Sequence, residues 1–387
     1  MPHKKKNKKK KSKSSIAGID LDLDKFENVH QIAGIRTAML APGTADATNV
    51  ALVNTGSGLR FTVALDRGGD IVDATYNRFS LAYLSPVGIK PPSAAHNVDM
   101  AWLRGWPGGL LTSCGPQYIG APRQEDGVQT SLHGRHSNTP AQVEMLINPD
   151  PHRGHNEMLL SMVIRDTSMF GPSLEVRRTI QCVVGRPQIH LYDQVMNRGN
   201  TRSAHNWLYH INLGYPLLDR GAQLLFRGRA NYFQNPSSDG AAPTDAALNR
   251  LKTITDPLPQ HAGMGERGLI VQVEPDRDGN CHAGLINRRL GIGVEITYPA
   301  AQLPRLANWQ HLGPAGSYVC GVEPFSGSLV GKANDDYPGA EQYLEPGQTR
   351  RYQLMIEVHE GEKALAGFAR RDGKVYGGKK RRSDVAT

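Results

Sequence analysis

The sequence predicts an all-β protein, folded as a large antiparallel β-sandwich. Three observations predict it. Short runs of β-branched and aromatic residues follow one another along the body, helical periodicity is nearly absent, and 42 Gly and 25 Pro supply turns. Short strands at this spacing are typical of sandwiches and barrels, whereas βαβ units need long helices between their strands.

The clearest strand-like runs cover residues 59–65, 159–165, 174–184, 188–196, 206–213, 269–273, 292–298 and 351–358. Residues 235–266, with two Pro-containing breaks, are expected to form a long insertion loop with a helix only near residues 243–251. No internal repeat is visible, and a 387-residue chain with 39% hydrophobic residues can bury one large core. We therefore expect a single domain over residues 16–369.

The positive charge of the chain is concentrated at its two ends. The formal charge is +9, of which residues 1–14 carry +8 and residues 370–387 carry +5, so the body between them carries about −4. Lys-rich ends of this kind are usually solvated and disordered, or touch RNA loosely. We expect disordered tails at residues 1–15 and 370–387, and no specific nucleic-acid partner because the body lacks a basic stripe with interleaved aromatics.

Cysteine spacing and hydropathy indicate the compartment. Cys114, Cys182, Cys281 and Cys320 lie far apart in apolar surroundings, which predicts buried free thiols and a reducing compartment. The sequence has no run of 18 apolar residues, and no apolar segment follows the Lys-rich start. The expectation is a cytoplasmic protein with no membrane partner, and the sequence does not set its oligomeric state.

A candidate site begins in the strand predicted over residues 206–213. With a period of two, Trp207, Tyr209 and Ile211 share one apolar face, and His210 and Asn212 share the other. A His and an Asn side by side, opposite a packed face, suit the floor of a polar cleft. A His that only hydrogen-bonds within a sheet is the alternative.

Four further segments carry side chains suited to binding a sugar. Glu323 ends an apolar run just before Pro324, and a carboxylate there is costly unless it is paired or functional. The loop at residues 131–140 holds His133, Arg135 and Asn138. Arg67 and Trp309 complete the set: Trp309 could stack on a sugar ring or fill the core, and Arg67 could bind ligand or lock a turn with Asp66.

Taken in order, these segments resemble the aldose 1-epimerase (galactose mutarotase) superfamily. The similarity is closest to an uncharacterised bacterial branch, through motifs at residues 66–71, 111–115, 132–141, 209–214 and 321–324. It spans roughly residues 30–360 and implies the large β-sandwich, or supersandwich, of galactose mutarotases.

The resemblance also implies roles for single residues. His210 would protonate the ring oxygen of a sugar, Glu323 would take the proton of the anomeric hydroxyl, and His133 would bind substrate. Ring opening needs an acid and a base at once, which a His and a carboxylate supply without a cofactor. We expect His210 and Glu323 on opposite sides of a sugar-sized gap, too far apart for a direct ion pair, with His133 and Trp309 lining it.

The chain departs from the family pattern in two places. The floor reads His210-Ile-Asn212-Leu-Gly, and no motif selects between Asp256 and His261 for a second substrate-binding side chain. Arg67, Arg135 and Asn138 suggest a polar or anionic sugar.

The alternative function is that of a member of the same fold that only binds sugar, or that acts as a lyase or isomerase on a modified or acidic sugar. The His133/His136 and His152/His155 pairs lack completing ligands, so no metal site is predicted.

Overall fold

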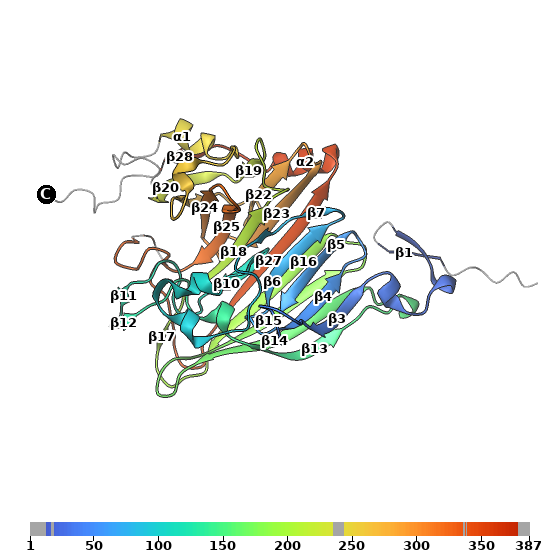
Figure 1. Ribbon diagram of the computed structural model, residues 1–387, viewed down its shortest axis with the longest axis horizontal. Helices are drawn as coiled ribbons and strands as arrows, with labels where there is room; N and C mark the ends of the chain where they lie inside the picture. Colours follow the sequence, from blue (N-terminus) through green and yellow to red (C-terminus); the bar gives the residue numbers. More distant parts are fainter. Residues whose placement is uncertain (1–12, 17–18, 235–243, 336, 338, 378–387) are drawn as a thin grey trace, which may run out of the picture.

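The computed structural model describes residues 13–16, 19–234, 244–335, 337 and 339–377. Two antiparallel sheets dominate this part of the chain and pack against each other (Figure 1). The 12-stranded sheet has the order β28 (Val375–Gly377), β20 (Gly228–Gln234), β21 (Arg267–Val273), β24 (Arg305–Leu312), β25 (Tyr318–Ser326), β18 (Trp207–Gly214), β10 (Leu111–Cys114), β6 (Asp70–Tyr76), β5 (Leu59–Ala64), β4 (Asn49–Asn54) and β3 (Gly34–Met39), with β7 (Phe79–Ser80) paired to β6.

The 8-stranded sheet has the order β13 (Ala141–Ile147), β14 (Glu157–Thr167), β15 (Ser173–Val183), β16 (Gln188–Asn197), β27 (Thr349–Glu360), β23 (Ile292–Pro299), β22 (Asn280–Asn287) and β19 (Gln223–Leu225). Four strand pairs lie apart: β1 (Lys13–Ile16) with β2 (Ile19–Asp22), β8 (Tyr83–Leu84) with β9 (Gly108–Gly109), β11 (Gln124–Glu125) with β12 (Val128–Gln129), and β17 (Ser203–Ala204) with β26 (Tyr343–Leu344). The predicted antiparallel β-sandwich is confirmed, and each predicted run overlaps a strand of the two sheets.

The helices are short. The α-helices are α1 (Asp245–Arg250) and α2 (Glu362–Ala369), and the 3-10 helices are η1 (Leu23–Lys25), η2 (Val29–Gln31), η3 (Ala94–Asn97), η4 (Asp99–Arg104), η5 (His136–Asn138), η6 (Pro151–Arg153) and η7 (Pro259–His261). The helix predicted near residues 243–251 is thus present as α1, while residues 235–243 of the predicted loop lie outside the described residues. None of the described helices is long and apolar enough to cross a membrane.

The core lies between the two sheets and includes the inner face of β18. Trp207, Tyr209 and Ile211 belong to it, as the period-two pattern predicts, and all four cysteines are buried free thiols. A buried ion pair of the 8-stranded sheet is hydrogen-bonded to the other sheet here. Arg178 on β15 binds Asp193 on β16 through Nε and Nη2 at 2.9 and 2.7 Å, and Tyr209 on β18 donates to the same carboxylate at 2.7 Å. Arg178 also donates to Ser113 on β10 at 2.7 Å, so the buried charges have partners on both sheets.

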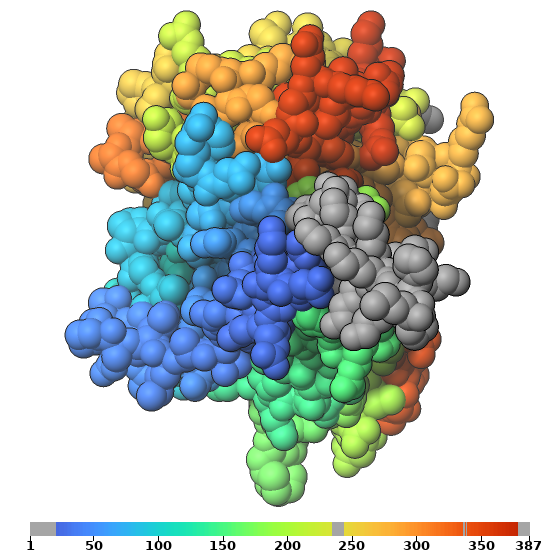
Figure 2. Space-filling model, turned by 90° about the vertical axis from the view of Figure 1, so that its right-hand side faces the viewer, coloured from blue at the N-terminus to red at the C-terminus, as the bar shows by residue number. Residues whose placement is uncertain are grey.

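Strands from the two ends of the chain also pack together. The hydroxyl of Tyr76 on β6 donates to the carboxylate of Glu360 at the end of β27, at 2.8 Å. Figure 2 shows these blue and red segments side by side. Early and late parts of the sequence therefore contact each other in the fold.

The predicted tail boundaries are wrong at both ends. Residues 13–16 form β1, and β28 pairs in parallel with β20, within the range expected to be a C-terminal tail. Asp372, in that same range, binds the buried ammonium of Lys252, which also donates to the backbone oxygens of Phe226 and Gly373 at 2.8 and 2.9 Å. A buried ammonium needs such partners, so the body extends to Gly377. Residues 1–12 and 378–387 lie outside the described residues.

Candidate functional site

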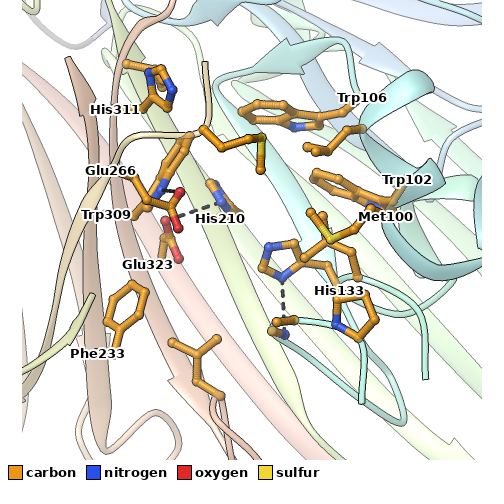
Figure 3. A pocket seen from close by; sticks show the side chains of 18 of the residues that line it. Met100, Trp102, Trp106, His133, His210, Phe233, Glu266, Trp309, His311 and Glu323 are labelled. Atoms are coloured by element: carbon orange, nitrogen blue, oxygen red, sulfur yellow. Dashed lines mark hydrogen bonds and ion pairs between the residues drawn. The ribbon is translucent and has the colours of Figure 1, made fainter. Parts of the chain in front are cut away.

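A cavity of about 910 Å³ opens on the face of the 12-stranded sheet that points away from the core. Its floor comes from β18, β24 and β25, through His210, Trp309 and Glu323. Loops supply the walls, among them η4 and the segments around His133 and Glu266 (Figure 3). The strand phase explains this placement, because His210 faces opposite to Trp207 and Tyr209.

His210 and Glu323 lie directly opposite each other on neighbouring strands. In the antiparallel register of β18 and β25, Leu208 pairs with Phe325 and Ile211 pairs with Val322, which sets His210 against Glu323. His210 Nε2 lies 3.3 Å from Glu323 Oε1. The prediction that a gap separates them is wrong, since cross-strand neighbours on one face come close whatever their separation in sequence.

This pair is buried without the partners that buried charges need. The contact between them lacks hydrogen-bond geometry, and neither Glu323 Oε1 nor His210 Nδ1 has a hydrogen-bond partner among the described residues. Glu323 is only 2% exposed. Burial lowers the pKa of His210 to about 4. Burial, and then the charge of Glu266, raise the pKa of Glu323 well above its ordinary value. Unsatisfied buried groups of this kind mark functional sites more often than structural ones.

Gly321 explains how Glu323 fits. A Cβ at position 321 would lie 1.9 Å from Glu323 Oε1. The carboxylate therefore folds back over Gly321, and a side chain at that position would displace it. The Gly-x-Glu spacing of the sequence thus suits the observed position of the Glu323 carboxylate.

His133 reaches the cavity from a strained loop. Its φ is 57°, in the left-handed region, and Gly134 follows with φ 73°. The N–H of Gly120 donates to His133 Nδ1 at 3.4 Å, so we assign the ring proton to Nε2, which makes that nitrogen a donor. Burial, and then the charge of His210, hold the pKa of His133 well below its usual range. His133 is thus a neutral donor whose ring centre lies 5.3 Å from that of His210.

Three of the four tryptophans in the chain line this cavity. Trp102 and Trp106 stack with ring centres 5.4 Å apart, and Trp106 meets His210 and Trp309 edge-on at 5.7 and 6.2 Å. The indole N–H of Trp309 donates to Glu266 Oε2 at 2.6 Å. The site therefore combines aromatic walls, two acidic side chains and the neutral His133 and His210, and His311 also lines it.

Four predicted residues meet here: His133, His210, Trp309 and Glu323. Asn212 lies behind His210, where its amide donates to the backbone oxygens of Gly109 and His210 at 3.1 and 3.0 Å, and it does not line the cavity.

The other predicted binding residues brace loops instead. Arg67 donates to Asn138 Oδ1 at 3.3 Å, and Asn138 in turn holds Ser93 and Asn97. Arg135 pairs with Asp166. None of the three predicted residues lines the cavity, so the expectation that they meet ligand there is corrected. Their polar atoms form hydrogen bonds and an ion pair with other segments of the chain. The sequence alone carries no signal for these contacts.

The sequence did not point to Glu266, Trp102 or Trp106. All three lie in loops or in η4, where no strand period marks the face of a side chain. Of the two residues considered as second substrate ligands, Asp256 pairs with Arg220 at 2.8 Å and His261 accepts from the Leu312 N–H at 3.0 Å. Neither lines the cavity, and Glu266 supplies the second carboxylate.

A group of residues that could hold a metal ion lies on the other sheet. Glu295, Glu357 and His359 bring ligand atoms within 4.8 Å of one another. The guanidinium of Arg371 binds Glu295 at the same place, and a cation there disfavours a second one.

Comparison with solved structures identifies the fold. A Klebsiella pneumoniae protein provisionally assigned as an aldose 1-epimerase matches with a TM-score of 0.79 and 20% identity, over 93% of this chain and 94% of that one. A Synechocystis sp. PCC 6803 protein matches with a TM-score of 0.61 and 16% identity, over 84% and 99% of the two chains. A galactose mutarotase-like protein of Clostridium acetobutylicum matches with 0.56 and 12%, over 85% and 99%. Identities this low show the fold alone.

The chain thus has a galactose mutarotase-like β-sandwich fold. A family model described as a domain of unknown function, DUF4432, matches residues 45–358, and the chain belongs to that family. No curated protein matches the chain.

Proposed function

We propose that this protein is an aldose 1-epimerase-like enzyme that binds a monosaccharide or sugar derivative and interconverts its anomers by proton transfer. The observation that supports it most is the buried pair of His210 and Glu323, which faces an aromatic cavity and in which His210 Nδ1 and Glu323 Oε1 lack hydrogen-bond partners among the described residues. A sugar would supply the missing partners. Its apolar ring face suits the tryptophans, and its hydroxyls suit the histidines and carboxylates.

The pair is suited to an acid and a base because it holds one mobile proton. A neutral imidazole beside a protonated carboxyl holds as many protons as an imidazolium beside a carboxylate, and burial favours the neutral form at rest. In the proposed reaction the proton moves to His210, which delivers it to the ring oxygen. Glu323 takes the proton of the anomeric hydroxyl as the bond between C1 and the ring oxygen breaks.

The products of that step are an open-chain aldehyde, a neutral imidazole and a protonated Glu323. Rotation about the C1–C2 bond and closure on the other face of the carbonyl give the second anomer. His133, with its proton on Nε2, donates to a sugar oxygen and positions the ring. The protein needs no cofactor for these steps.

Neutral sugars are favoured over anionic ones. The expectation of an acidic sugar depended on Arg67, Arg135 and Asn138, which do not line the cavity. Glu266 and Glu323 do, and a carboxylate on the ligand would be repelled by the negative charge of Glu266 and would oppose the loss of the Glu323 proton that the reaction needs. A carbohydrate is the partner we propose, and the cytoplasmic location predicted from the unpaired cysteines stays a prediction.

Polarimetry tests the proposal. Freshly dissolved α-anomers of a panel of neutral aldoses should equilibrate faster with the protein than without it. The His210→Asn variant should lose at least about 10²-fold of this acceleration, since it removes the acid. Acceleration that survives unchanged in His210→Asn, or shifts in melting temperature with nucleotides and with no sugar, would refute the proposal.

A further inference from the structure

The catalytic pair lies beside an apolar layer of the same cavity. Residues two apart on a strand point to the same face, about 6–7 Å from each other. One step from His210 on β18 is Leu208, and one step from Glu323 on β25 is Phe325. Both belong to a buried apolar cluster that also packs Phe233, Leu329 and Val330. Because these last three line the cavity, we call them the apolar flank.

On the opposite side of the pair the cavity is walled by Trp102 and Trp106, which are buried and stacked on each other. Their indole N–H groups donate to Ser137 and Thr112 at 3.2 and 3.0 Å. A volume of about 910 Å³ is near the top of the range, roughly 300–1,000 Å³, of drug-sized ligand pockets, and one sugar ring fills only part of it. The apolar flank is therefore available to a second group of the same ligand.

The apolar flank offers few polar partners. Arg123 lines the cavity there. Its Nε and Nη1 bind Glu125 and the backbone oxygens of Ile119 and Ala121, so only Nη2 has no hydrogen-bond partner among the described residues. Phe233 lies over Gly268, where a Cβ would come within 2.2 Å of the ring. The missing Cβ at Gly268 lets the Phe233 ring rest there, at the lower left in Figure 3. A fixed aromatic ring with few hydrogen-bonding neighbours suits an apolar group better than a second sugar.

We propose that the natural ligand is a sugar carrying an apolar aryl or acyl group. Its sugar ring lies against His133, His210 and Glu323, and its apolar group packs against Phe233, Leu329 and Val330. This inference rests on the proposed function, since it assumes that the polar half of the cavity holds a sugar.

Calorimetric titration with matched ligands tests it. A neutral hexose that binds is compared with its methyl and phenyl glycosides, its 6-O-methyl and 6-O-benzyl ethers, and a disaccharide that contains it. We expect the aryl compound of at least one pair to bind about tenfold more tightly than its methyl partner, as burial of an aromatic ring predicts. The pair that shows the gain identifies the substituted oxygen.

Two variants locate the gain. Phe233→Ala should reduce the aryl-to-methyl ratio to about twofold or less while the parent hexose keeps its affinity. Gly268→Ala displaces the ring without removing it and should also reduce the ratio. Phe170→Ala is the matched control, because this phenylalanine is 99% exposed in the turn after β14 and does not line the cavity.

The outcomes separate the two proposals. If no sugar binds, the proposed function fails. If the hexose binds and neither aryl group adds affinity, the inference fails while the function stands. If the disaccharide alone gains affinity and loses it in Phe233→Ala, the flank holds a second sugar and the inference is overturned.

Discussion

The molecule contains two buried glutamates that each meet histidine, one on each sheet, and their surroundings are opposite. Glu295 on β23 is fully buried and accepts from His282 Nδ1 at 2.8 Å, from His359 Nε2 at 2.7 Å and from the Arg371 guanidinium. Glu323 on β25 is as deeply buried, yet its Oε1 has no hydrogen-bond partner among the described residues. Glu295 thus has three hydrogen-bond donors around it, whereas Glu323 Oε1 has none among the described residues.

The pKa values follow this difference. Hydrogen bonds from His282, His359 and Arg371 outweigh burial at Glu295 and hold its pKa at about 2. Burial prevails at Glu323 and raises its pKa. A saturated carboxylate stabilises the fold, whereas an unsaturated one stores free energy that a ligand can release. The hydrogen-bond partners of the two carboxylates therefore distinguish two clusters that contain the same residue types.

The largest expected effect is on turnover, in Glu323→Gln. The amide keeps the shape of the side chain but cannot act as a base, so anomerisation should slow about 10²–10⁴-fold, or about 3–5 kcal/mol in the barrier. Because the folded protein disfavours the charged form, the amide should leave the free energy of unfolding at pH 8 unchanged or higher. Polarimetry and urea unfolding measure the two quantities. A large loss of stability would place Glu323 with Glu295 as a structural residue.

Glu295→Gln is the converse test. It removes the charge that three donors share, so the free energy of unfolding should fall by about 3 kcal/mol, near the lower end for a broken buried ion pair. Turnover per folded molecule should stay at the wild-type value, because Glu295 does not line the cavity. Urea unfolding and active-site titration check this. Impaired turnover with intact stability would make the second cluster part of the site.

Lowering the pH should reduce the free energy of unfolding through Glu295. The folded pKa of Glu295 is depressed to about 2, so its contribution is present above the unfolded value of about 4.3 and is lost as pH falls toward 2. Hydrogen bonds that His282 donates to Glu295 and Asp276 raise the pKa of His282 against the effect of burial, so its contribution is lost as pH rises through that raised value. Melting temperatures from pH 2 to 5 should fall more steeply in wild type than in Glu295→Gln. Equal slopes would exclude Glu295 as the source.

The sequence predicted the fold well because the fold depends on local patterns. Period-two runs and Gly/Pro turns predicted both sheets, and the strand phase correctly placed His210 away from Trp207. The sequence motifs, together with the family resemblance, also selected four residues that line the cavity: His133, His210, Trp309 and Glu323.

Long-range packing determined the rest. Which strand neighbours which decides that His210 touches Glu323, and loop packing decides that Arg67 binds Asn138 instead of lining the cavity. The edge pairing of β28 depends on a buried Lys252 more than a hundred residues earlier. A single sequence carries no local signal for such contacts, and Glu266 was missed for the same reason.

The smallest expected effect is a shift of the pH–rate profile when Glu266 is replaced. The negative charge of Glu266 adds to burial in raising the pKa of Glu323. Glu266→Gln removes that charge, so the pKa of Glu323 should fall. Because loss of the one proton of the pair leaves His210 with none to deliver, the alkaline limb of the pH–rate profile should move to lower pH, by about one unit or less, which is about 1.4 kcal/mol. Trp309→Phe is the control, because it removes the indole hydrogen bond to Glu266 but keeps the charge. It should weaken binding slightly and leave the alkaline limb in place. An alkaline limb that moves equally in both variants would mean that the hydrogen bond, and not the charge, sets the proton affinity of the site.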